Sequence, residues 1–124
     1  MTWIKQVRGV RGATTIERDT REDVVERVTE LLSSMCHRNG LSETDIVSIL
    51  FTATDDVHSV FPATAARDFG FAEVPLMCAR ELDITGATPL CIRILVTART
   101  RRRQSEVTHV YLHGATNLRS DLAK

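Results

Sequence analysis

The sequence predicts an α+β fold, in which a mixed β-sheet of about five strands packs against one long helix and short helical turns. Two observations support this prediction. Residues 21–38 carry apolar side chains at three- and four-residue spacing, which is typical of an amphipathic helix. Residues 3–16, 46–54 and 90–98 are rich in β-branched side chains, which is typical of strands. One helix covers only one face of such a sheet, so we expect further copies of the chain to cover the other face.

The chain has 124 residues, of which 43% are hydrophobic and 26% are charged. These values predict a single globular domain, residues 1–124, with a substantial core. The 16 basic and 16 acidic residues cancel, which argues against nucleic acid or an anionic membrane as a partner of the whole chain. No apolar run is long enough to cross a membrane, and no secretory signal is visible. The three cysteines lack the spacing of a zinc site or a disulfide framework, so the cytoplasm is the expected compartment.

The first predicted strand, residues 3–16, is interrupted by Gly9 and Gly12. A glycine inside a strand marks either a bulge or a close approach by another backbone or a ligand. Arg11 stands between these glycines. Its side chain is equally compatible with a solvated position on an edge strand and with contact to a ligand.

The predicted helix, residues 21–38, has recognisable ends. Thr20 is the expected N-cap, and acidic residues follow it in the first turn, where the helix dipole favours them. Gly40 is the expected stop signal. One face of the helix carries the apolar stripe that we expect to be buried, Val24, Val28, Leu31, Leu32 and Met35.

The middle of the chain predicts two strands and a short helix. Residues 46–54 are apolar almost throughout, which predicts a strand covered on both faces. Pro62 suits the first turn of a short helix over residues 63–69, and Gly70 suits its end. Residues 74–78 are extended but contain Pro75, which indicates an edge strand or an irregular segment.

The last predicted elements form a hairpin. Residues 90–98 are the most strongly patterned strand of the chain, residues 99–104 are the expected turn, and residues 107–112 are the expected returning strand. The arginine run within the turn is a possible nucleic-acid patch. It lacks interleaved aromatic residues, so a solvated tip that protects a strand edge is the favoured interpretation.

Arg93 is the residue that fits the pattern least, because it lies inside an otherwise apolar strand. A guanidinium in a buried strand needs an anion beside it. The anion could be Glu81 or Asp83 of the same chain, or it could belong to a ligand, and the sequence pattern favours an internal salt bridge. The histidines have no metal-ligand spacing and no nucleophile is paired with a base, so we expect neither a metal nor another cofactor.

Several segments resemble one known family when they are taken together. They are residues 8–20, 52–63, 66–67, 74–78, 81–86, 91–93, 109–112 and 118–122. In order and spacing they resemble the monofunctional, trimeric chorismate mutases of the pseudo-α/β-barrel class. The resemblance implies three subunits whose sheets form a barrel-like core, with helices outside and active sites at the subunit interfaces. It also implies the Claisen rearrangement of chorismate to prephenate, in the biosynthesis of phenylalanine and tyrosine.

The resemblance assigns a role to each matching residue. Arg93 would stabilise the charge on the ether oxygen, and Glu81 would accept a hydrogen bond from the ring hydroxyl. Arg11 and Tyr111 would bind carboxylates. The remaining substrate-binding residues would be the apolar walls and flanking cations, Phe61, Ala63, Leu76, Leu118, Arg67 and Arg119, together with the backbone of Cys78. The rearrangement needs no nucleophile, which agrees with the absence of a recognisable one.

Two substrate-binding positions depart from the family pattern. Thr64 stands where family members often have lysine, and Met77 stands where a smaller residue, often threonine, is common. An alternative function, outside the enzymes, is that of a non-catalytic trimer that binds a small carboxylate metabolite as a sensor. A further trimeric family, of the imine-deaminase type, has a similar architecture, but its signature segments are not found here. Turnover of chorismate separates an enzyme from a sensor.

Overall fold

The computed structural model of the chain describes residues 3–118. Its strands form a sheet in the order β3-β2-β4-β1-β5. The central strand β4 is antiparallel to both of its neighbours, whereas the edge strands β3 and β5 are parallel to β2 and β1. The predicted α+β class with a mixed five-stranded sheet is therefore confirmed. The strands are β1 (Gln6–Thr15), β2 (Ile46–Ala53), β3 (Leu76–Arg80), β4 (Cys91–Thr100) and β5 (Val110–Tyr111).

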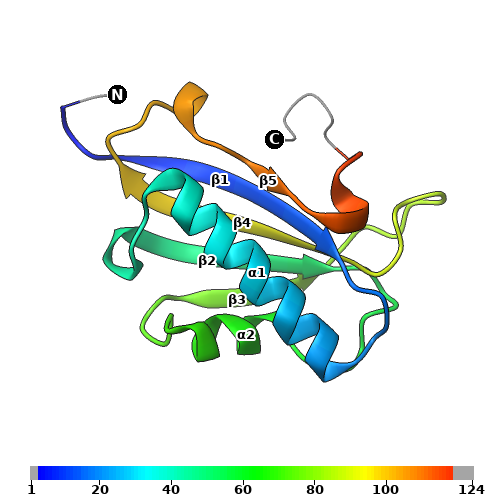
Figure 1. Cartoon of the computed structure of the whole chain (residues 1–124). Coiled ribbons are helices and arrows are strands. Elements are labelled where there is room, and N and C mark those ends of the chain that lie inside the picture. The colour runs from blue at the N-terminus through cyan, green and yellow to red at the C-terminus, as the bar shows by residue number, and fades with distance from the viewer. Residues whose placement is uncertain (1–2, 119–124) are drawn as a thin grey trace.

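Two helices cover one face of this sheet. The long helix α1 (Arg21–Asn39) crosses in front of the strands, and the short helix α2 (Pro62–Phe69) lies beside β3 (Figure 1). The Thr20 hydroxyl accepts a hydrogen bond from the backbone N–H of Asp23 at 3.2 Å, and Gly40 ends α1 in the left-handed conformation. Both predicted helices and both predicted caps of α1 are confirmed. Within residues 3–118, neither helix combines the length and the apolar character that a membrane crossing requires.

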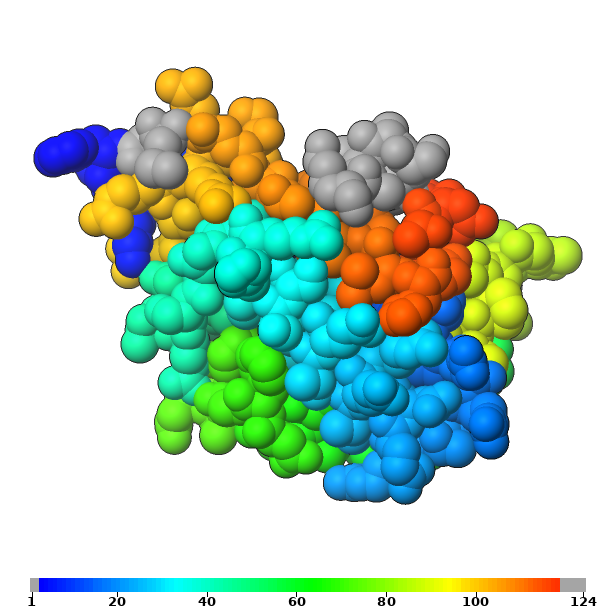
Figure 2. All heavy atoms as spheres, in the orientation of Figure 1, coloured from blue at the N-terminus to red at the C-terminus, as the bar shows by residue number. Residues whose placement is uncertain are grey.

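The core lies between the helices and the sheet. The predicted stripe of α1 is completely buried, and it packs on alternate residues of the strands, such as Phe51, Ile92 and Val96. Figure 2 shows the side chains of α1 and α2 closing this side of the molecule. Strand alternation therefore sends Phe51 and Ile92 toward the helices and their sequence neighbours to the opposite side.

Gly12 marks a close approach rather than a bulge. A Cβ atom at this position would lie 2.4 Å from the Sδ atom of Met35 and 3.2 Å from a methyl carbon of Leu31. The pairing of β1 with β4 is continuous from one end of the strands to the other. The glycine is thus required because α1 rests directly on β1 at this point.

The face of the sheet away from α1 and α2 is here called the open face. Within residues 3–118 it is covered only beside β5, where Ala13, Tyr111, Ala115 and Leu118 pack together. Leu50 and Thr52 point to it from β2, while Ile49 and Phe51 are buried beneath the helices. The prediction that residues 46–54 are covered on both faces is wrong for the single chain. The expectation that one sheet face stays uncovered in a monomer is confirmed over β2 and β4, where Leu95 is 41% exposed.

The predicted hairpin of residues 90–98 and 107–112 is wrong. Only Val110–Tyr111 form a strand, and this strand pairs in parallel with β1 instead of β4. The reason is that β1 and β2 already occupy both edges of β4. The chain that leaves β4 must therefore pass to the outer edge of β1.

Arg99, Arg101 and Arg103 are exposed, as predicted, but the arginine run is not the tip of a hairpin, which corrects a second prediction. Arg99 belongs to β4, and Arg102 turns inward to the end of α1. The Nη1 atom of Arg102 donates hydrogen bonds to the carbonyl oxygen of Arg38 at 2.7 Å and to Oδ1 of Asn39 at 3.2 Å. The loop after β4 is thereby fastened to the carboxyl end of the helix.

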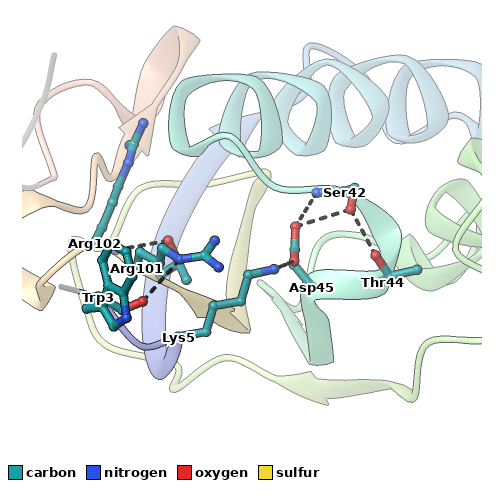
Figure 3. Close-up of polar contacts among 8 residues, drawn as sticks. Trp3, Lys5, Ser42, Thr44, Asp45, Arg101 and Arg102 are labelled. Carbon is teal, nitrogen blue, oxygen red and sulfur yellow. Dashed lines mark hydrogen bonds and ion pairs between the residues drawn. The ribbon is translucent and has the colours of Figure 1, made fainter. Parts of the chain in front are cut away.

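The N-terminal segment is fastened nearby (Figure 3). Nε of Arg101 donates to the carbonyl oxygen of Trp3 at 3.3 Å. Nζ of Lys5 lies 2.8 Å from Oδ1 of Asp45, whose other oxygen accepts from the backbone N–H of Ser42. The hydrogen bond from Lys5, followed by that from the Ser42 backbone, lowers the pKa of Asp45. These contacts join the start of β1 to the turn before β2.

Candidate active site

Arg93 projects from near the start of β4 onto the open face. Its cross-strand neighbours are Ala13 on β1 and Thr52 on β2, and Tyr111 on β5 lies beside Ala13 in the same row. The Arg93 side chain is 47% exposed. The expectation of a buried arginine is therefore corrected, because the strand is covered on one face only and Arg93 points to the other.

Glu81 supplies the anion beside Arg93. Nε of Arg93 lies 3.4 Å from Oε2 of Glu81, and Oγ1 of Thr52 donates a hydrogen bond to the same oxygen at 2.6 Å. The backbone N–H of Glu81 donates to the carbonyl oxygen of Ala53 at 3.0 Å, which holds the segment after β3 against β2. The predicted internal salt bridge is confirmed. An exposed pair of this kind adds little stability, and the guanidinium fork has further donors for a ligand.

Arg11 joins this group from the neighbouring row of the open face. Its cross-strand neighbour on β4 is Leu95. Arg11, Arg93 and Tyr111 line one shallow hollow of about 200 Å³, together with Leu50, Thr52 and Leu95. The structure therefore brings three predicted site residues together around a small surface with two cationic side chains. Such a surface favours an anionic ligand.

A second group of predicted residues lies at the other edge of the sheet. Phe61, Thr64 and Cys78 line a cleft of about 870 Å³ between α2, β3 and the loop before α2. Phe61 is 72% exposed, so its ring is available to a ligand or to another subunit. The residues that line this cleft do not overlap with those that line the hollow around Arg93.

An ion pair that the sequence did not indicate borders the second cleft. Both guanidinium nitrogens of Arg80 that face Asp55 lie 2.6 Å from its carboxylate oxygens. The hydrogen bonds from Arg80 lower the pKa of Asp55. The cleft thus combines an apolar wall at Phe61 with a charged rim.

The remaining predicted residues are distributed around these two groups. Met77 is 68% exposed and points to the open face, whereas Ala63 is buried in the core. Leu118 packs against a small cluster that includes Tyr111. Leu76 and Cys78 pack partly against the main core, and Arg67 is exposed on α2. Arg119 lies outside the described residues.

Asp19 is a site-supporting residue that sequence reasoning missed. Its carboxylate accepts hydrogen bonds from the backbone N–H groups of His58 at 2.8 Å and Ser59 at 3.0 Å. Burial acts to raise the pKa of Asp19, but the hydrogen bonds from Ser59 and His58 outweigh it and lower the pKa. These contacts fix the loop that leads to Phe61. No spacing rule could have revealed them, because donor and acceptor lie 39 and 40 positions apart.

The comparisons with known proteins agree on one family. Residues 7–122 match the family model described as chorismate mutase type I. The chain is 42% identical over 118 residues to chorismate mutase AroH of Bacillus subtilis (strain 168), covering 94% of this chain and 93% of that protein. It is 45% identical over 117 residues to chorismate mutase AroH of Thermus thermophilus, covering 94% of this chain and 96% of that protein. The solved structure of chorismate mutase from Clostridium thermocellum superposes with a TM-score of 0.86 at 42% identity, covering 87% of this chain and 96% of that chain.

Proposed function

This chain belongs to the chorismate mutase type I family and acts as a chorismate mutase, and from this premise we propose that Arg93 and Glu81 are its catalytic residues. The reaction rearranges chorismate to prephenate in the biosynthesis of phenylalanine and tyrosine. It is an intramolecular pericyclic reaction, so it requires no covalent bond to the protein and no proton transfer. The protein has to hold a flexible dianion in a compact shape and to stabilise the charge that develops as the ether bond breaks.

The ion pair of Arg93 and Glu81 is the observation that carries the proposal. Negative charge grows on the ether oxygen in the transition state, and a cation already in place there binds the transition state more strongly than the substrate. Glu81 holds the Arg93 guanidinium at 3.4 Å and is itself held by Thr52. The free carboxylate oxygen of Glu81 can accept a hydrogen bond from the ring hydroxyl of chorismate.

The other predicted residues divide the binding of the dianion between them. Arg11 and Tyr111, which share the hollow with Arg93, bind carboxylate. Phe61, Met77 and Thr64 form the opposite wall. The backbone of Cys78 adds a polar contact. The expected supporting residues are the apolar Ala63, Leu76 and Leu118 and the cations Arg67 and Arg119.

We also propose that the functional unit is a homotrimer in which open faces meet to form a pseudo-α/β barrel. The two groups of site residues line different hollows within one chain. Leu95 and Met77 expose apolar surface between them on the open face. Contact between copies would bury this surface and bring the Arg93 group of one subunit to the Phe61 group of its neighbour. The three free cysteines agree with a cytoplasmic location for this assembly.

Depletion of chorismate by wild type, Arg93→Ala and Arg93→Lys tests the catalytic proposal. Removing one transition-state donor typically costs about 3–4 kcal/mol, so we expect Arg93→Ala to lower kcat by at least roughly 100- to 1,000-fold. Arg93→Lys keeps the charge but loses the fork, and we expect severe impairment. Arg99→Lys is the matched control. Arg99 lies on the same face of β4 as Arg93, and the variant should retain activity.

Two outcomes would contradict the proposal. Near-normal turnover by Arg93→Lys would show that the guanidinium fork is not needed. Wild type that binds chorismate without converting it would indicate a sensor of a small carboxylate rather than an enzyme.

A further inference from the structure

We propose that His109 and Gln104 are positioning residues for Arg11. The inference rests on the proposed function, in which Arg11 binds a carboxylate of chorismate. Neither residue points into the hollow around Arg93. Both act on the backbone of the strand from which Arg11 projects.

The outer edge of β1 is only partly covered by a strand. β5 pairs with Gly12 and Ala13. Among residues 3–118, no strand lies beside the part of β1 that precedes Gly12 on that edge. An exposed edge of this kind leaves backbone N–H and C=O groups unpaired and the strand easily displaced. Arg11 lies at the point where the strand pairing on this edge ends.

Two side chains continue the hydrogen bonding where β5 stops. Nδ1 of His109 accepts a hydrogen bond from the backbone N–H of Arg11 at 2.9 Å. Two positions earlier, Oε1 of Gln104 accepts from the N–H of Gly9 at 3.0 Å, and Nε2 of Gln104 donates to the carbonyl oxygen of Gly9 at 2.7 Å. The Gln104 amide therefore bonds to Gly9 as a neighbouring strand would.

His109 is itself held by a rigid connection to α1. The preceding residue, Thr108, exchanges two hydrogen bonds with the side chain of Asn39, each 2.8 Å long. Asn39 is 3% exposed, and its amide also donates to the carbonyl oxygen of Met35 at 2.8 Å. The end of α1 therefore fixes Thr108, and with it the backbone of His109.

This support matters because glycines surround Arg11. Gly9 and Gly12 leave the backbone of β1 with more conformational freedom than other residues would. A displacement of about 1 Å at a substrate-positioning group can lower activity substantially. His109 and Gln104 restrain that freedom at the residues where it would misplace the Arg11 guanidinium.

The test compares two substitutions of His109 by steady-state kinetics with chorismate. Asparagine can place its Oδ1 atom where Nδ1 of His109 accepts, whereas phenylalanine keeps the ring and loses the acceptor. We expect His109→Phe to raise KM for chorismate roughly fivefold to tenfold with a smaller change in kcat. His109→Asn should restore KM to near the wild-type value. Ser105→Ala, in the same loop, is the control.

A double-mutant cycle separates positioning from general stability. If His109 acts through Arg11, His109→Phe should raise KM no further in an Arg11→Ala background. Equal KM values for His109→Phe and His109→Asn, or additive effects with Arg11→Ala, would overturn the inference. Gln104→Met gives the same test through Gly9 if His109→Phe does not fold.

The same experiment distinguishes failure of the inference from failure of the proposed function. Absence of turnover by wild type would refute the function, and an unchanged KM in Arg11→Ala alone would refute the role of Arg11. The inference about His109 fails by itself if wild type converts chorismate and Arg11→Ala raises KM, but the cycle shows no coupling between His109 and Arg11.

Discussion

The hydroxyl of Thr52 lies closer to the Glu81 carboxylate than the guanidinium of Arg93 does. The Thr52 hydroxyl lies 2.6 Å from the same Glu81 oxygen that faces Arg93. A hydrogen bond to a charged group is worth about 1.5–3 kcal/mol. The position of the Glu81 carboxylate therefore depends on a neutral side chain of another strand.

The substitution Thr52→Val keeps the shape of the side chain and removes this hydrogen bond. We expect kcat/KM for chorismate to fall roughly tenfold or more, because the carboxylate loses its fixed orientation. Thr97→Val is the matched control, since Thr97 also lies on the open face, on β4, but outside the hollow around Arg93. Steady-state kinetics of both variants measures the effect, and equal losses would contradict the prediction.

The loop before α2 is an element whose conformation depends on Asp19. The carboxylate stabilises the fold above its unfolded-state pKa of about 4. Its folded-state pKa is lowered, so this contribution is lost as the pH falls through the folded-state value.

The substitution Asp19→Asn should therefore lower the free energy of unfolding at pH 7. The difference from wild type should begin to narrow as the pH drops below about 4, where Asp19 becomes protonated in the unfolded state. It should be lost once the pH is below the lowered folded-state pKa, where the native carboxylate is protonated as well. Urea unfolding of both proteins between pH 7 and pH values below about 4 measures the difference in the free energy of unfolding. Asp68→Asn removes the same charge from an exposed position of α2 and is the control. A pH-independent difference would argue against the carboxylate as the cause.

The contact between β1 and α1 depends on Gly12. An alanine Cβ would lie 2.4 Å from a buried sulfur of Met35, so α1 or its side chains would have to move. Overpacking of this kind costs about 1–3 kcal/mol. This exceeds the roughly 0.4–1 kcal/mol that alanine gains by restricting the unfolded chain.

We therefore expect Gly12→Ala to be less stable than wild type in denaturant unfolding. Gly9→Ala is the matched control in the same strand, because its Cβ would lie 3.6 Å from a Leu95 methyl group, an ordinary contact. The control should be as stable as wild type or slightly more so. Similar losses for both variants would show that the approach of α1 is not the reason for Gly12.

At the scale of the whole molecule, the open face is the surface through which we propose that the subunits assemble. Leu95 lies on it between Leu50 and Arg11 in one row across three strands. In the proposed trimer the two leucines of this row are buried. Placing an unpaired charge there would be costly.

We expect wild type to sediment as the proposed trimer in analytical ultracentrifugation and Leu95→Arg to sediment as smaller species. Turnover should fall together with the mass, because each site of the proposed trimer combines residues from two subunits. Glu26→Arg, on the exposed face of α1, is the control and should leave the mass unchanged. A monomeric wild type, or an unchanged mass for Leu95→Arg, would contradict the proposed assembly.

Much of the fold was predictable because the signals were local. The helix predicted over residues 21–38 is observed as Arg21–Asn39, with Thr20 and Gly40 at its ends. Apolar spacing and caps act within one or two turns, so they can be recognised without knowledge of the partner elements. The need of Arg93 for an anion also limited its partner to Glu81, Asp83 or a ligand, since an unpaired charge in an apolar strand is costly.

The contacts that were not predicted all join distant parts of the chain. The sequence pattern of residues 107–112 indicates a strand but not its partner, and the strand that forms pairs with β1. The inward turn of Arg102, the contact of Thr52 with Glu81 and the bond from Arg11 to His109 depend on this strand order. The spacing of apolar residues along the chain does not predict which strands become neighbours in the sheet.

The sequence by itself determined the elements, the family resemblance and the side chains available for binding a dianion. Only the tertiary structure decided that Arg93, Arg11 and Tyr111 share one hollow, and that Phe61 and Thr64 line another. The physical reason is that element formation depends on interactions between near neighbours along the chain, whereas a site depends on the order and register of strands. That order is set by the burial of all elements together.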